Sequence, residues 1–285
     1  MTKVILFDID GTLINTGGAG LRALNKALSA MGGPKNVCSF FELQGSTDRV
    51  NFENAYRCAF NKKPSEKDYK RIKELYIKFL PEEVEYSVKN KKYFKIKGIE
   101  RLLEKLSNRK DILIGLGSGN LKEGAYIKLE PSRLSHYFLF GGFGEKHEKR
   151  EDMLKTAVKD AEIILKEKIS PSYVYVIGDT EKDIIAAKNC DYHSACVLDG
   201  FGDKKKIFAA EPEFMEKDFA NTNVWLMWLG IAKDPKGIKR GTYICPDTPI
   251  EHAYYGMTGN GSILQSTEIS DKIIAVRKKK RNKGQ

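Results

Sequence analysis

Two aspartates near the start of the chain, Asp8 and Asp10, are separated by a single residue. Because the side-chain period of a strand is two, an extended backbone places both carboxylates on the same face. Gly11 and Thr12 follow directly, and a sharp turn at a glycine exposes backbone N–H groups that suit an anion. The sequence therefore offers two carboxylates and an anion-binding turn at one place.

Further groups of the same kind stand much later in the chain. Ser118, followed by Gly119 and Asn120, ends one apolar run, and Asp179 ends another. Asp183 lies four residues after Asp179 at an expected helix start, so the two side chains point the same way. Carboxylates gathered together are costly unless a cation neutralises them. A set of oxygen ligands suits magnesium, and we expect Mg²⁺ as the cofactor.

The elements that position these groups follow from the apolar pattern. Each polar loop comes after a short apolar run that predicts a buried strand. The predicted strands are residues 4–7, 112–116, 173–177 and 193–197. Helical patterns alternate with strands after residue 98, which predicts an α/β fold with a doubly wound parallel sheet. Ligands of such sheets bind at the carboxyl ends of the strands, so Asp8, Ser118 and Asp179 should converge.

The segment from residue 16 to residue 93 has helical spacing and no convincing strand, which indicates an inserted all-helical domain. We expect the core to comprise residues 1–15 and 94–230, and the insertion to comprise residues 16–93. Residues 231–285 then form a C-terminal extension, which contains a basic tail at residues 277–285.

Charge and hydropathy restrict the partners. The formal net charge is +11, but a basic terminus is more often solvated than bound to nucleic acid, so we expect no nucleic-acid partner. No apolar run approaches the ~20 residues that span a bilayer. The first apolar stretch, residues 4–7, is also too short for the core of a signal peptide. We therefore expect a cytoplasmic protein without a membrane partner.

In this order and spacing, the polar loops resemble the motifs of the haloacid dehalogenase superfamily, and the resemblance spans residues 3–200. The first motif of that family stands here as Asp8-Ile9-Asp10-Gly11-Thr12. The second resembles the strand that ends at Ser118, and the fourth stands as Gly178-Asp179-Thr180-Glu181-Lys182-Asp183. The resemblance implies a Rossmann-like core of the kind predicted above.

The third motif departs from the family pattern, which has a lysine at the start of a helix. The register of the helix that follows favours Arg150 for this place, with Lys149 as the other candidate. Arginine supplies the same charge and can bind phosphate through two N–H groups, so the substitution is compatible with catalysis.

The resemblance implies a role for each residue. Asp8 would attack phosphorus to form an aspartyl-phosphate, and Asp10 would protonate the leaving alkoxide and then activate water. Asp10 favours phosphate-ester hydrolysis, since a halide leaving group needs no proton. Asp8, Asp10, Asp179 and Asp183 would hold the Mg²⁺ ion, Asp10 through its backbone carbonyl. The expected phosphate-binding groups are Gly11, Thr12, Ser118, Gly119, Asn120 and Arg150.

Members of this family often carry a mobile helical cap between the first and second motifs, where residues 16–93 lie. Such a cap closes over the site and excludes water. The polar turn at residues 45–49 resembles a substrate-facing cap loop, in which we assign Thr47 to substrate binding; a plain helix N-cap is the alternative. The whole pattern is most similar to phosphoglycolate phosphatases and their relatives. We therefore expect a phosphatase that hydrolyses a small phosphorylated metabolite.

Three other functions stay open at this point. A phosphosugar mutase of the same family shares these motifs. A non-catalytic relative could use the fold for binding alone. A phosphatase acting on nucleic-acid ends would be guided by the basic tail at residues 277–285.

Overall fold

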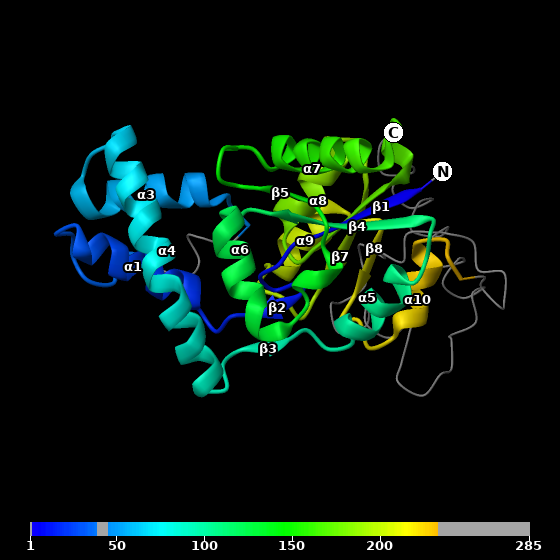
Figure 1. Cartoon of the computed structure of the whole chain (residues 1–285), viewed down its shortest axis with the longest axis horizontal. Coiled ribbons are helices and arrows are strands. Elements are labelled where there is room, and N and C mark those ends of the chain that lie inside the picture. Colours follow the sequence, from blue (N-terminus) through cyan, green and yellow to red (C-terminus); the bar gives the residue numbers. More distant parts are fainter. Residues whose placement is uncertain (1, 39–44, 233–285) are drawn as a thin grey trace, which may run out of the picture.

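The computed structural model describes residues 2–38 and 45–232 (Figure 1). The C-terminal extension from residue 233, with its basic tail, lies outside the described residues. Among the residues that are described, no helix is long and apolar enough to cross a membrane.

A six-stranded sheet forms the centre of the molecule, with the strand order β5-β4-β1-β6-β7-β8 (Figure 1). All neighbouring strands in it run parallel. The strands are β1 (Lys3–Phe7), β4 (Ile112–Ser118), β5 (Gly141–Phe143), β6 (Val174–Gly178), β7 (His193–Val197) and β8 (Phe214–Glu216). This confirms the predicted doubly wound parallel sheet and adds two short strands, β5 and β8, that the apolar pattern did not predict.

The first strand of the chain, β1, lies in the middle of the sheet, and its register with β4 and β6 determines where these strands end relative to one another. Phe7 pairs with Leu116 of β4 and with Ile177 of β6. The three strands therefore end almost together, and the backbone N–H of Asp8 still donates to the Ile177 carbonyl at 2.9 Å. Residues that follow these strands must meet at one edge of the sheet.

Helices cover both faces of the sheet, as the alternation of side chains along β1 requires. Ile5 and Phe7 belong to one core cluster, together with side chains of α5, α6 and α10. Val4 and Leu6 belong to the cluster on the other face, with α7 and α8. The helices of the core are α5 (Ile99–Ser107), α6 (Lys122–Leu129), α7 (Arg150–Leu165), α8 (Glu181–Lys188), α9 (Lys204–Ala210) and α10 (Thr222–Trp228).

The inserted segment is helical, as predicted, and lies at one end of the molecule (Figure 1). Its described helices are α1 (Ala19–Ala30), α3 (Asp48–Phe60) and α4 (Glu66–Lys89). They share a separate core cluster that includes Leu24, Phe52 and Ile72. The chain enters and leaves this segment through an antiparallel pair of two-residue strands, β2 (Ile14–Asn15) and β3 (Phe94–Lys95). The domain limits at residues 15, 93 and 230 stay a prediction.

Candidate active site

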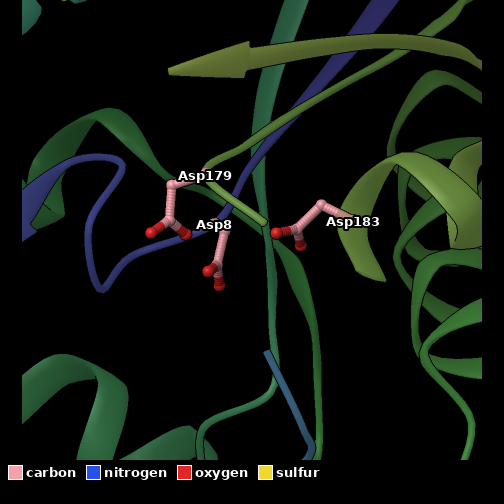
Figure 2. A group of neighbouring side chains, drawn as sticks. All are labelled: Asp8, Asp179 and Asp183. Carbon is pink, nitrogen blue, oxygen red and sulfur yellow. The ribbon is translucent and has the colours of Figure 1, made fainter. Parts of the chain in front are cut away.

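Three buried carboxylates meet at the carboxyl edge of the sheet. Asp8 follows β1, Asp179 follows β6, and Asp183 lies in the first turn of α8. Figure 2 shows the three side chains close together, with Asp183 pointing toward the other two, and one oxygen of each lies within 4.8 Å of those of the others. The convergence expected from the strand ends is present in the structure.

The local backbone holds two of these carboxylates in place. Asp183 completes a capping box with Thr180, whose backbone N–H and hydroxyl donate to Asp183 Oδ2 at 3.1 and 2.7 Å. Asp179 Oδ2 accepts from the Phe201 N–H at 2.6 Å. Gly11 has a positive φ of 82°, and a Cβ at this position would come within 2.1 Å of Asp179 Oδ2. Position 11 in the turn after β1 therefore requires glycine, because Asp179 fills the space that any larger side chain would need.

The carboxylates repel one another in the protein interior. Burial, together with the neighbouring Asp183 and Asp10, raises the pKa of Asp8 to about 7 despite the opposing effect of Arg150. Burial and the charges of Asp183 and Asp8 raise the pKa of Asp179 well above its usual value. A hard divalent cation relieves both effects, because it neutralises the oxygens that are otherwise forced together. The residues therefore fit a divalent metal ion.

Arg150, the first residue of α7, is the cation next to this cluster. Its Nη2 forms an ion pair with Asp183 and lies 3.5 Å from Asp8 Oδ1. Its Nη1 donates to the Gly45 carbonyl at 3.3 Å. Lys149, the other candidate for this place, is exposed and precedes the helix as its N-cap. Of the two candidates, Arg150 is thus the one that lies beside the carboxylates, and its third-motif role stays a prediction.

A second polar cluster surrounds Asp10. Asn120 Nδ2 donates to Asp10 Oδ2 and to Ser118 Oγ, both at 2.8 Å. Lys128 of α6 donates to the same Asp10 oxygen at 2.7 Å and to Asn120 Oδ1 at 2.5 Å. Burial opposes the charge of Lys128, but the charges of Asp10, Tyr76 and Asp48 outweigh it and raise the Lys128 pKa. Sequence reasoning missed Lys128, which stands in α6 as an ordinary helical lysine.

The turn before α3 docks on the core. The Asp48 N–H donates to the Gly119 carbonyl at 2.6 Å, and Asp48 Oδ2 accepts from the Leu121 N–H at 2.8 Å. Burial raises the pKa of Asp48 to about 6. Thr47 is the N-cap of α3 and accepts from the Val50 N–H at 3.4 Å. The structure thus gives Thr47 the capping role, and Asp48, which sequence reasoning did not select, faces the site.

A cavity of about 120 Å³ joins the two clusters. Of the predicted site residues, those on its wall are Asp8, Asp10, Ser118, Gly119, Asn120, Arg150 and Asp179. Gly11, Thr12, Thr47 and Asp183 are not among the lining residues. The inserted segment contributes both apolar and polar lining residues, among them Leu24, Phe52, Tyr76 and Asp48. The two parts of the chain come very close here, since a Cβ at Gly119 would lie 2.4 Å from the Ser46 carbonyl oxygen.

Comparisons with known proteins agree with this architecture. The chain is 32% identical over 226 residues to a phosphoglycolate phosphatase of Aquifex aeolicus, and the match covers 74% of this chain and 91% of the relative. A predicted phosphatase from Clostridium acetobutylicum has a similar fold, with a TM-score of 0.60 and 20% identity over 80% of this chain and 99% of its own. The β-phosphoglucomutase of Clostridium difficile gives a TM-score of 0.57 and 19% identity over 78% of this chain and 93% of its own.

The family model for haloacid dehalogenase-like hydrolases matches residues 5–197, from the middle of β1 to the end of β7. That range contains both polar clusters and the whole inserted segment. With three buried aspartates at the carboxyl edge of the sheet and this match over most of its length, the chain belongs to the haloacid dehalogenase-like hydrolases.

Proposed function

We propose that this protein is a magnesium-dependent phosphatase that hydrolyses a small phosphate monoester through an aspartyl-phosphate on Asp8. The observation that supports it most is the buried cluster of Asp8, Asp179 and Asp183 beside Arg150, next to a cavity that Asp8, Asp179 and Arg150 line. In such a cluster Asp8 offers a nucleophilic oxygen, and Arg150 together with a bound metal ion would balance the charge of a phosphoryl group.

Each residue has a role in this proposal. Asp8 attacks phosphorus, and Arg150 balances the charge of the phosphoryl oxygens. Ser118, with the backbone N–H groups of Gly119 and Asn120, binds those oxygens. Asp10 gives its proton to the leaving oxygen and later accepts one from the attacking water. A magnesium ion held by Asp8, Asp179, Asp183 and the Asp10 carbonyl would supply charge neutralisation at the phosphoryl group.

The size and lining of the cavity support a small substrate. A volume of about 120 Å³ leaves room for a phosphoryl group and a leaving group of a few heavy atoms. The inserted segment lines it with apolar side chains such as Leu24 and Phe52 and with polar ones such as Asp48, so a small substrate would meet both kinds of contact there. The similarity to the Aquifex phosphoglycolate phosphatase supports a small phosphorylated metabolite in the same way.

The test is phosphate release from a panel of small phosphate monoesters, with and without magnesium. Wild type is compared with Asp8→Asn and with Asp111→Asn, whose side chain is 53% exposed and lies far from the site. Magnesium-dependent release that survives in Asp111→Asn and disappears in Asp8→Asn supports the proposal. Absence of release from every ester would contradict it, and conversion of a hexose 1-phosphate to its 6-phosphate without release would identify a mutase instead.

A further inference from the structure

The two oxygens of the Asp10 carboxylate have unequal surroundings. Oδ2 accepts two hydrogen bonds, from Lys128 Nζ at 2.7 Å and from Asn120 Nδ2 at 2.8 Å. Oδ1 accepts from the Thr16 hydroxyl at the longer distance of 3.3 Å. An oxygen that accepts from an ammonium and an amide has no room for a proton of its own. Any proton on Asp10 is therefore directed to Oδ1.

Lys128 is built into the structure so that its ammonium reaches this oxygen. The residue is 6% exposed, although a lysine on a helix is normally solvated. A Cβ at Gly20 of α1 would lie 3.2 Å from both Lys128 Nζ and the Tyr76 hydroxyl. The ammonium is thus enclosed between α1, α4 and the core. Its other acceptor, Asn120 Oδ1 at 2.5 Å, fixes the amide that also holds Ser118.

From this arrangement we infer that Lys128 is a positioning residue for Asp10: it ties Oδ2 so that Oδ1 is the oxygen that exchanges protons with the substrate. The inference rests on the proposed phosphatase function and adds a residue to it. Lys128 does not touch the reacting atoms in this scheme, because it acts through the Asp10 carboxylate.

The proton balance of the scheme is simple. In the first half-reaction an Asp8 oxygen bonds to phosphorus, the bond from phosphorus to the leaving oxygen breaks, and the proton of Asp10 Oδ1 passes to that oxygen. Asp10 is then a carboxylate, and Lys128 and Asn120 stabilise its charge at Oδ2. In the second half-reaction water gives a proton to Oδ1 as its oxygen attacks phosphorus, and Asp8 is released.

The test uses two small esters of similar shape whose leaving groups differ in their need for a proton. Ethyl phosphate releases ethanol, whose alkoxide must be protonated, whereas acetyl phosphate releases acetate, which leaves without a proton. The quantity compared is kcat/KM in excess magnesium, which reports steps up to the transfer of the phosphoryl group to Asp8. The variant is Lys128→Met, and Lys122→Met, an exposed lysine of the same helix, is the matched control.

Lys128→Met should lower kcat/KM for ethyl phosphate by ~10- to 100-fold, because it removes part of the contribution of a positioned general acid. For acetyl phosphate the same variant should lower kcat/KM by less than ~3-fold. Lys122→Met should leave both values unchanged. An equal loss on both esters, or no loss, would overturn the inference. If Lys128→Met lacks a cooperative thermal transition, Lys128→Leu, which also has no N–H donor, is measured instead, and a wild-type ratio of the two esters would again overturn it.

These outcomes separate the inference from the proposed function. If the wild-type enzyme releases no phosphate from any ester, the proposed function is wrong and the role of Lys128 with it. If the wild type is active and the ratio of the two esters does not change in a folded Lys128 variant, only the role of Lys128 is wrong.

Discussion

Replacement of Asp8 by asparagine should remove turnover and, at the same time, make the metal-free protein more stable at pH 8. In the folded protein burial and repulsion raise the Asp8 pKa from 3.8 to about 7. A carboxyl whose pKa is raised by folding holds its proton more tightly in the folded state. Stability is therefore lost as the pH rises from about 4 to about 7, and the full penalty persists above pH 7. Asparagine carries no charge and avoids the penalty.

The size of the effect follows from the pKa change. A difference of about three units corresponds to ~4 kcal/mol at pH 8, since each unit is worth ~1.4 kcal/mol. A buried amide that lacks good partners costs ~1–2 kcal/mol, which leaves a net gain of ~2–3 kcal/mol. In a domain of this size that gain raises the melting temperature by ~5–10 °C. At pH 5 the penalty of the wild type is only ~1.6 kcal/mol, and the two effects nearly cancel.

The assay is thermal unfolding of wild type and Asp8→Asn in a chelator, at pH 8 and at pH 5. Asp111→Asn serves as the control, because Asp111 is exposed and should not reproduce the gain. In excess magnesium at pH 8 the wild type should have the higher melting temperature of the two. The ion neutralises the wild-type cluster, whereas the variant lacks one of its ligands and binds it more weakly. A melting temperature of Asp8→Asn at or below that of wild type, at pH 8 without metal, would refute the reasoning.

Three further predictions concern the same cluster. Arg150→Met leaves buried carboxylates without their cation and should lower the free energy of unfolding by ~3–5 kcal/mol in a metal-free denaturant titration. Magnesium should recover part of this stability. Magnesium affinity measured by calorimetry should fall at least about tenfold per pH unit below about 7, because Asp8 and Asp179, whose pKa values are both raised, must release their protons to bind the ion. Gly11→Ala should weaken magnesium binding at least ~10-fold by displacing Asp179. Gly32→Ala, at an equally positive φ of 89° with nothing within 4 Å, should affect stability alone; equal magnesium affinities in the two glycine variants would contradict this assignment.

The fold was predictable where the sequence pattern is local. The strands β1, β4, β6 and β7 are apolar runs, and the buried cores on the two faces of β1 follow from strand periodicity. β5 and β8 have only three residues each and contain no apolar run that stands out. They form strands because β4 and β7 offer them free edges, which is a property of the assembled sheet.

The site divides in the same way. Asp8, Asp179 and Asp183 were predictable because each stands where a strand ends or a helix begins. Lys128 was not, since α6 contains two lysines and only the packing against α1 and α4 buries one of them. Asp48 and Thr47 are adjacent, and the sequence could not tell which of them caps α3 and which faces the cavity.

The position of β1 has a consequence for the order in which the protein folds. Its two neighbours, β4 and β6, begin at residues 112 and 174, so the central pairings close very long chain segments, and contacts of this kind form slowly. The pairing of Ile14 with Lys95 brings the ends of roughly 80 intervening residues together and thereby shortens the segment that β1 and β4 must close. Mutations that loosen the contact between α1 and α4 should therefore slow the folding of the six-stranded sheet, although both helices lie outside it.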